Sequence, residues 1–295
     1  MKKLKFKKID AFTKGLAPGN PAGYILLDEE GSLDEAGMQK IALELKGFVN
    51  EVGFVSKPDG QYRLRFYSSE CEVAFCGHAT IAIMYDLLSS GAENEEKEVP
   101  IHVKAGRLSV FNHIEEEDAI YIMAPAPHYL DCWLTVQQVA DALDIDTTVI
   151  DDKMPLRLVD GGLRTLLVPV RSLDGCLSIS PDYEKLRIFC LENGIDIVHV
   201  SVKETRTASC RFRTRVFAPK YGYLEDPATG SGNAAFGYRL LEENRWDGDF
   251  VVEQGSKLDD PSFVKLRKHD SEDGLRMLFG GCGTTRIEGF YCYHG

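Results

Sequence analysis

The stretch FCGHATIAIMYDLL, residues 75–88, combines a thiol, a glycine and an imidazole with an apolar segment. Cys76 and His78 stand at the start of this segment, whose apolar residues predict a buried helix from about residue 78 to 88. A thiol beside an imidazole could act as a nucleophile with its base. For each residue taken alone the structural role is the more common one, because buried cysteines and helix-capping or core histidines are frequent.

Carboxylates and hydroxyls elsewhere in the chain could complete an acid–base site. Glu51 interrupts the apolar run FVNEVGFV, so its side chain is either turned to solvent or partly desolvated. Partial desolvation makes a carboxylate a stronger base, which suits general acid–base catalysis. A second group of candidates occupies the stretch EDPATGSGN, namely Glu225, Asp226, Thr229 and Ser231. For Asp226, which precedes a proline, an ordinary turn is the structural alternative.

The turn-into-helix pattern occurs twice in the sequence. Residues 76–88 align without gaps on residues 229–241, which places Gly77 on Gly230. Both segments follow an Arg/Phe-rich strand pattern, YRLRFYS or RTRVFAP, and both precede a V-x-x-G turn into further strands. Matching segments in the same order predict two domains of one fold, each with strands around a single apolar helix.

Two helix starts of this kind favour the binding of a carboxylate or phosphate. A helix N-terminus presents unsatisfied N–H groups and the positive end of the helix dipole. Glycine at that point lets a ligand approach the backbone closely. Two such starts facing each other across a cleft would hold a small carboxylate-bearing molecule.

Local signals predict where other elements begin and where the domains divide. Two pairs, Ser32 with Glu35 and Thr135 with Gln138, have the spacing of helix capping boxes. Pro181 is typical of a first helical position. The Pro-rich APAPHY predicts a domain boundary. We therefore expect domains at residues 1–126 and 127–295, with a final strand that could cross back to the first domain.

Composition narrows the possible partners. The chain has 295 residues, of which 44% are hydrophobic and 27% charged, as in globular proteins. Its net charge of −12 argues against a nucleic-acid backbone or an anionic membrane as the main partner. No secretory signal or membrane span is recognisable, which predicts a cytoplasmic protein. The eight cysteines form no C-x-x-C pair, so we expect free thiols and no structural metal.

Seven motifs together resemble the phenazine-biosynthesis isomerase (PhzF-like) family, within the diaminopimelate epimerase and proline racemase fold group. They are DAF at 10–12, GNPAG at 19–23, MQKIALEL at 38–45, NEVGFV at 50–55, CGHAT at 76–80, EDPATGSGN at 225–233, and EQG with PS at 253–262. The resemblance implies an α+β fold of two similar domains, each a strand barrel wrapped around a central apolar helix, with the active site between them. It also implies a small-molecule carboxylate substrate, no cofactor, no metal and a homodimer.

The resemblance further assigns roles to residues. Glu51 would be the general acid/base of an isomerase that moves a proton between carbons of the substrate. His78 and Asp226 would assist by hydrogen bonding and proton handling. The implied substrate-binding residues are Asn20, Asn50, Gly77, Gly230 and Ser231.

Two other functions remain open. Related racemases and epimerases use two cysteines as paired bases, and Cys76 matches the first of them. The aligned position is Thr229, whose hydroxyl is too weak a base at neutral pH, so racemisation by two thiols is disfavoured. A non-catalytic binding protein on the same scaffold is the third possibility. The chain also departs from the family where Asp259 and Asp260 replace the usual Gly-Arg pair before PS.

Overall fold

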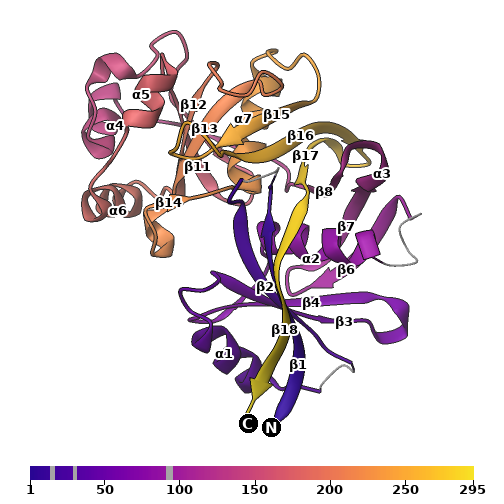
Figure 1. The fold of residues 1–295 in the computed structure, drawn as a ribbon. Coiled ribbons are helices and arrows are strands. Elements are labelled where there is room, and N and C mark those ends of the chain that lie inside the picture. Colours follow the sequence, from indigo (N-terminus) through magenta and orange to yellow (C-terminus); the bar gives the residue numbers. More distant parts are fainter. Residues whose placement is uncertain (14–16, 29–31, 91–95) are drawn as a thin grey trace. The chain divides into compact units, whose positions relative to one another are not determined.

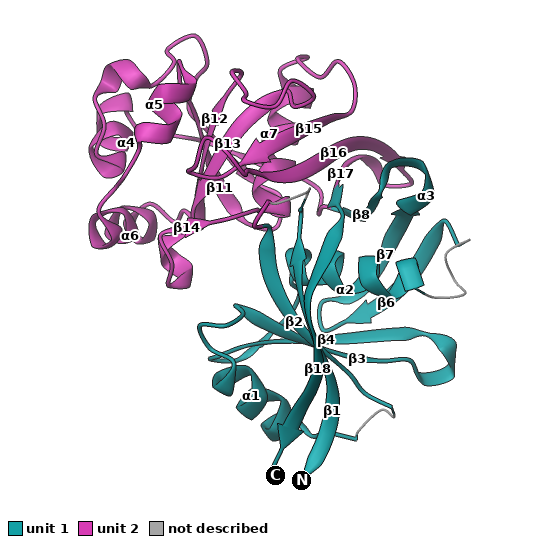
Figure 2. Cartoon of the chain, viewed as in Figure 1, with its two compact units in different colours: residues 1–15, 19–123, 280–295 teal, residues 16–18, 124–279 magenta. Residues whose placement is uncertain are grey.

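The computed structural model describes residues 1–13, 17–28, 32–90 and 96–295. The chain divides into two compact units (Figure 2). Unit 1 comprises the described parts of residues 1–15, 19–123 and 280–295, and unit 2 comprises those of residues 16–18 and 124–279. The last segment of the chain, predicted within 127–295 as a strand that could cross back, therefore belongs to unit 1 in the structure.

Unit 1 consists mainly of strands, with both chain termini at one end (Figure 1). Its elements are β1 (Lys2–Ala11), β2 (Asn20–Leu26), α1 (Glu35–Glu44), β3 (Glu51–Ser56), β4 (Tyr62–Ser68), β5 (Glu72–Val73), α2 (Gly77–Ser90), β6 (Glu98–Val103), β7 (Gly106–His113), α3 (Ile114–Glu117), β8 (Ala119–Met123) and β18 (Gly283–Tyr293). Strand β1 pairs antiparallel with both β18 and β2, and β2 runs parallel to β3. The first and last strands of the chain are therefore neighbours, with Lys2 opposite Tyr293.

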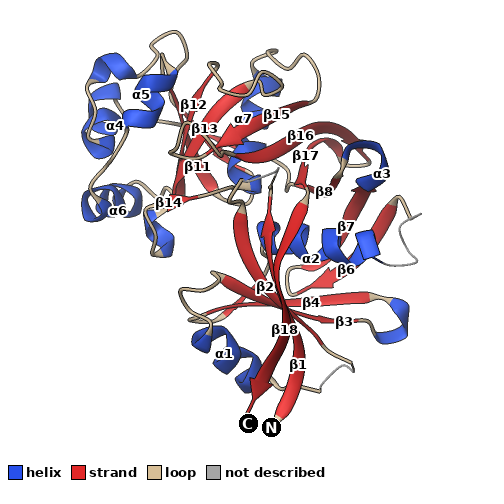
Figure 3. Ribbon diagram, in the orientation of Figure 1, coloured by secondary structure: helices blue, strands red, loops and turns tan. Residues whose placement is uncertain are grey.

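Helix α2 is the central helix of unit 1. It packs against β1, β2, β3, β8 and β18 (Figure 3), and its residues Ala79–Met84 are buried. Asp86 links this helix to the strands, because its carboxylate accepts hydrogen bonds from Lys7, Tyr24 and Thr285. The helix thus contributes both an apolar surface and a polar anchor to the barrel.

Unit 2 repeats this plan with additional outer helices. Its elements are β9 (His128–Leu130), α4 (Val136–Leu143), β10 (Arg157–Asp160), β11 (Arg164–Pro169), α5 (Leu173–Ser178), α6 (Tyr183–Glu192), β12 (Ile197–Val202), β13 (Phe212–Phe217), β14 (Glu225–Asp226), α7 (Gly230–Glu242), β15 (Phe250–Gln254), β16 (Ser262–Ser271) and β17 (Gly274–Gly281). Helices α4, α5 and α6 supply part of a core cluster with β11 and β12, whereas α7 is the apolar central helix and packs against β10, β11, β12 and β16.

The strand pairing confirms the internal repeat. In unit 1, β3 and β4 are antiparallel, the short β5 pairs with β4, and β4 runs parallel to β6 beyond the central helix. In unit 2, β12, β13, β14 and β15 have the same relations around α7. An ion pair is repeated as well, because Arg65 on β4 contacts Glu72 on β5 and Arg215 on β13 contacts Glu225 on β14. The predicted α+β fold, two similar units that each surround an apolar helix, is confirmed.

Two of the three predicted helix starts are wrong in detail. Thr135 and Gln138 form the expected capping box at α4. Helix α1 is capped by Asp34 rather than Ser32, because the Asp34 carboxylate accepts a hydrogen bond from the Gly37 N–H and suits the positive end of the helix. Helix α6 starts at residue 183 after the cap Asp182, so Pro181 lies before the helix. No helix in the described parts of the chain is long and apolar enough to cross a membrane.

Candidate active site

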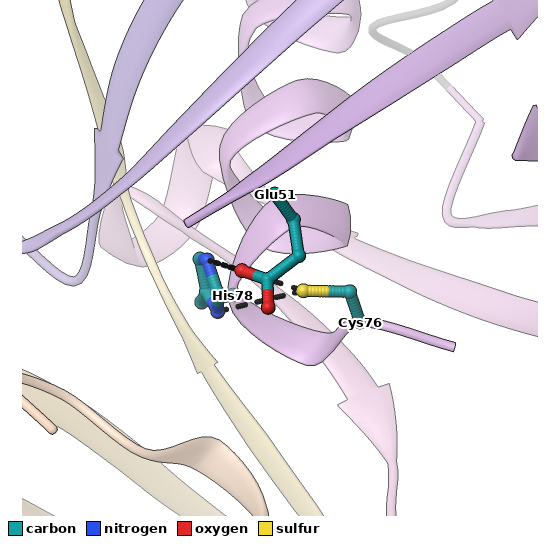
Figure 4. Close-up of side chains that lie close together, drawn as sticks. All are labelled: Glu51, Cys76 and His78. Carbon is teal, nitrogen blue, oxygen red and sulfur yellow. Dashed lines mark hydrogen bonds and ion pairs between the residues drawn. The ribbon is translucent and has the colours of Figure 1, made fainter. Parts of the chain in front are cut away.

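Glu51, Cys76 and His78 lie together in unit 1 (Figure 4). The Nε2 atom of His78 is 3.3 Å from the Oε2 atom of Glu51. The Sγ atom of Cys76 is 3.5 Å from Nδ1 and 3.9 Å from Nε2 of the same imidazole. Two of the three predicted catalytic residues, Glu51 and His78, are therefore in contact, and Cys76 lies beside them.

Regular secondary structure holds each of the three side chains. Glu51 is the first residue of β3 and lies opposite Ala22 of β2 and Ser68 of β4. His78 is in the first turn of α2, and Cys76 directly precedes that helix. The carbonyl of Cys76 accepts hydrogen bonds from the backbone N–H and the hydroxyl of Thr80, at 3.0 and 2.7 Å. These contacts fix the helix start and therefore the separation of Cys76 and His78.

Burial and mutual contact set the electrostatics of the site. Burial raises the pKa of Cys76, although the neighbouring His78 opposes that change. Burial also lowers the pKa of His78, but the contacts with Cys76 and Glu51 outweigh it and hold that pKa above its ordinary value. Because the charge of Cys76 is the largest contribution that raises the pKa of His78, the thiol and the imidazole titrate as a coupled pair.

The same three side chains are also a possible cation site. Their oxygen, nitrogen and sulfur donor atoms all lie within 4.8 Å of one another. No other such group occurs in the parts of the chain that the structure describes.

The other predicted catalytic residue, Asp226, lies in unit 2 within a buried polar network. The hydroxyl of Thr229 donates to Oδ2 of Asp226 at 2.5 Å, and Nε2 of Gln254 donates to that hydroxyl at 3.0 Å. The Gln254 amide nitrogen also donates to the Asp226 carbonyl, at 2.8 Å. On its other side, Oε1 of Gln254 accepts from the Asn233 amide at 2.7 Å. Asp226 and Thr229 are thereby fixed in position.

Sequence reasoning missed His199, which extends this network. The imidazole Nε2 lies 3.1 Å from Oδ1 of Asn233, and the ring stacks on Phe236 with centroids 5.2 Å apart. Burial lowers the pKa of His199 to about 4, so the ring is neutral at pH 7. The sequence did carry a signal, because Asn233 and Gln254 are polar residues inside the apolar runs GNAAFGY and FVVEQ.

The structure explains the glycine at the start of α7 by packing. A Cβ atom at Gly230 would lie 2.2 Å from Cδ2 of Phe279. Ser231 is the next residue of that helix start, and Gly77 holds the corresponding first position of α2. The predicted approach of a ligand to the backbone at these positions stays a prediction.

The remaining predicted residues lie at the beginning of strands or on the surface. Asn20 is fully buried as the first residue of β2, and Asn50 is exposed directly before Glu51. The substrate-binding roles of both stay predictions. Asp259, which departs from the family pattern, is exposed and lies 3.5 Å from Arg206. It therefore engages a surface cation within unit 2.

Solved structures identify the class of fold. The crystal structure of a Bacillus anthracis phenazine biosynthesis protein of the PhzF family matches with a TM-score of 0.88 at 27% identity, over 99% of this chain and 100% of that one. A hydroxyproline epimerase from Agrobacterium vitis matches with a TM-score of 0.61 at 14% identity, over 99% of this chain and 91% of that one. The fold is therefore that of the PhzF proteins and the proline racemase and epimerase group.

Sequence relatives identify the family within that class. The family model described as phenazine biosynthesis-like protein (PhzC-PhzF) matches residues 9–289. The uncharacterized isomerase YfhB of Bacillus subtilis is 30% identical, over 97% of this chain and 99% of its own. A trans-2,3-dihydro-3-hydroxyanthranilate isomerase of Pseudomonas fluorescens is 26% identical, over 94% and 95% respectively. The chain belongs to the phenazine biosynthesis-like (PhzC-PhzF) family and is an enzyme of the isomerase class.

Proposed function

We propose that the chain catalyses a cofactor-independent proton shift between carbons of a small carboxylate-bearing substrate, with Glu51 as general acid/base. The observation that carries this proposal is the state of the Glu51 carboxylate. Its Oε2 atom is shielded from solvent and, apart from the contact with His78, has no hydrogen-bond partner among the described residues. Such an oxygen has only the contact with His78 to exchange when it accepts a proton.

His78 has a supporting role in this scheme. An Nε2–H group of His78, 3.3 Å from the carboxylate, stabilises the negative charge of Glu51 before the proton is taken. It can also return a proton to an anionic intermediate. We assign Asp226 the assisting role that the family resemblance implies, as a carboxylate fixed by Thr229.

Substrate binding follows from the two helix starts. We infer that backbone N–H groups at Gly77, Gly230 and Ser231 bind the substrate carboxylate, because a helix N-terminus favours an anion. Asn50 directly precedes Glu51 and Asn20 begins the neighbouring strand β2, and both are proposed to complete the substrate-binding residues. The homodimer and the cytoplasmic location stay predictions.

The first substrates to test are cyclic amino carboxylates. Relatives from Pseudomonas fluorescens and Pseudomonas chlororaphis are named trans-2,3-dihydro-3-hydroxyanthranilate isomerases. We propose that this chain acts on a substrate of the same chemical class, in which a proton next to an activated carbon is mobile. A carboxylate group on that substrate would match the proposed backbone binding site.

The test is proton exchange in heavy water. NMR spectroscopy of the product should show deuterium at the carbon that receives the proton. Glu51→Gln removes the base while it preserves size, and we expect at least a ~10³-fold loss of turnover. The matched control is Glu117→Gln, since Glu117 also lies near a histidine, with its Oε1 atom 3.9 Å from Nδ1 of His113. Undiminished turnover in Glu51→Gln would refute the assignment.

A racemase or epimerase that uses Cys76 is the alternative mechanism. The contact of Cys76 Sγ with His78 gives the thiol a proton acceptor. Exchange of the substrate α-hydrogen that is lost in Cys76→Ala but retained in Glu51→Gln would favour it. A non-catalytic binding protein is disfavoured because the relatives are named isomerases.

A further inference from the structure

We propose that a one-way chain of hydrogen bonds runs from His199 to Asp226 and favours the ionised form of the Asp226 carboxylate. The members of this chain are buried in unit 2, and they are His199, Asn233, Gln254, Thr229 and Asp226. Gln254 is its positioning residue, because its side chain decides which way the Thr229 hydroxyl points. The proposal rests on the proposed function only where it predicts an effect on turnover.

Two backbone groups fix the orientation of the Gln254 side chain. The N–H of Thr229 can only donate, and its nitrogen lies 3.1 Å from Oε1 of Gln254. The carbonyl oxygen of Asp226 can only accept, and it lies 2.8 Å from Nε2 of Gln254. If the oxygen and the nitrogen of the amide were exchanged, a donor would face a donor and an acceptor would face an acceptor. The Gln254 amide therefore has one allowed orientation.

This orientation sets the direction of the hydrogen bond between Thr229 and Asp226. The amide nitrogen of Gln254 can only donate, so the Thr229 hydroxyl, at 3.0 Å, accepts from it. The hydroxyl proton is then directed to Oδ2 of Asp226, at 2.5 Å. A hydrogen bond donated to a carboxylate stabilises its charged form relative to the protonated one. Gln254 thus acts on Asp226 through Thr229.

The same reasoning extends the chain to His199. The amide nitrogen of Asn233 lies 2.9 Å from the carbonyl oxygen of Thr229 and 2.7 Å from Oε1 of Gln254, so both of its protons are directed to acceptors. Its Oδ1 atom is left to face Nε2 of His199, at 3.1 Å, and the neutral imidazole must carry its proton on Nε2 to donate there. Nδ1 of His199 has no hydrogen-bond partner among the described residues, so no contact opposes this tautomer. Each hydrogen bond in the chain polarises the next one toward Asp226.

Charged side chains on the neighbouring elements are matched by partners of their own. Those of β13, β14, β15 and α7, apart from Asp226 and Glu242, form three pairs: Arg213 with Glu253, Arg215 with Glu225, and Arg239 with Glu243, which follows α7. Glu242 lies at the opposite end of α7, about 18 Å from its first residue along the helix axis. The titratable hydroxyl of Tyr238, also on α7, donates to the carbonyl of Pro125. Hydrogen bonding is therefore the contribution to Asp226 that a substitution in the chain changes.

NMR spectroscopy of the full-length protein tests the chain without a substrate. At pH 7 the imidazole nitrogens of His199, identified by their absence in His199→Gln, should show the neutral tautomer with the proton on Nε2. In a titration of labelled carboxyl carbons, Asp226 should take up its proton about one pH unit higher in Thr229→Val, because the hydroxyl donor is gone. Gln254→Glu should act in the same direction, since a carboxylate there accepts the hydroxyl proton itself. Thr229→Ser keeps the hydroxyl and should titrate like the wild type.

The pH dependence of turnover tests the consequence for the reaction. The acid limb of kcat should move to higher pH in Thr229→Val and Gln254→Glu by the interval that NMR measures, whereas a merely structural role would lower kcat at every pH without moving the limb. Gln61→Glu is the matched control, because Oε1 of this exposed glutamine also contacts a histidine, at 3.1 Å from Nε2 of His102. It should leave the limb in place.

The outcomes separate this proposal from the proposed function. The opposite tautomer of His199 overturns the chain, and that measurement uses the unmodified protein, so it stands even if a variant fails to fold. An unshifted Asp226 titration in Thr229→Val, with circular dichroism unchanged, overturns the chain as well. A shifted titration with an unmoved acid limb would leave the chain standing and overturn the assisting role of Asp226.

Discussion

Replacement of Gly230 by alanine separates a packing role from a ligand-binding role at the start of α7. The added Cβ atom would lie 2.2 and 2.3 Å from Cδ2 and Cε2 of Phe279, and 2.9 Å from Cγ. Because these are ring atoms of a residue only 2% exposed, the ring has to move as a whole. Overpacking of this kind costs about 1–3 kcal/mol, and the better helix propensity of alanine returns at most about 1 kcal/mol.

The expected net loss for Gly230→Ala is therefore about 1–2 kcal/mol of the free energy of unfolding. For a unit of this size, each kcal/mol lowers Tm by roughly 2–4 °C, so scanning calorimetry should show a decrease of about 2–8 °C. Phe279→Leu in the same chain should recover part of that decrease, because the smaller side chain makes room for the methyl group.

Gly237→Ala is the matched control within the same helix. Its Cβ atom would lie 2.9–3.2 Å from side-chain atoms of Met277, whose flexible thioether can move away. We expect a Tm within about 2 °C of the wild type. An unchanged Tm in Gly230→Ala would refute the packing argument. If activity also fell in that variant, the glycine would be required for ligand approach instead.

Three further predictions concern stability and proton transfer. The pKa of His199 is lowered to about 4, so between about pH 6.5 and 4 the unfolded chain binds a proton there and the folded chain does not. Acidification across this window should therefore lower the free energy of unfolding by up to about 3 kcal/mol. Urea denaturation at several pH values should show a smaller pH dependence of that free energy in His199→Gln. Asp86→Ala should lower the free energy of unfolding by about 2–3 kcal/mol, because it removes the hydrogen bonds between α2 and three strands. In the same assay, Glu70→Ala, which removes an exposed ion pair, should lower it by less than about 0.5 kcal/mol. If Glu51 both takes and returns the proton, a substrate deuterated at the migrating position should give, in ordinary water, a product that retains part of the deuterium. Complete loss of the deuterium in a single turnover, measured by mass spectrometry, would contradict this.

Local sequence signals predicted the repeated elements well because their causes are local. The helices at 77–90 and 230–242 begin at aligned glycines, and the residues before them form a strand pair in both units. Both signals depend on neighbouring residues: the apolar run of a buried helix and the alternation of a strand. The capping residue of α1 was wrong because Ser32 and Asp34 are both good caps, and only the position of Gly37 in the folded chain selects the aspartate.

The polar contacts between elements could not be read from spacing. Asp86 binds partners from three strands that are 62 to 199 residues away in the sequence. The link of His199 to Gln254 through Asn233 likewise depends on how α7 packs between strands. Such contacts follow from the tertiary arrangement, and a single sequence carries them only as polar residues in apolar runs.

The two units differ at the one position where a two-base mechanism needs them to be alike. In unit 1, Cys76 has its Sγ atom 3.5 Å from an imidazole that can take its proton. At the aligned position in unit 2, the hydroxyl of Thr229 donates to Asp226 and accepts from Gln254, so its proton and a lone pair are both engaged. A hydroxyl held in this way, with its high intrinsic pKa, cannot remove a proton from carbon at neutral pH. The repeat therefore supplies two helix starts but a candidate base at only one of them, which is the physical argument against a mechanism with two paired bases.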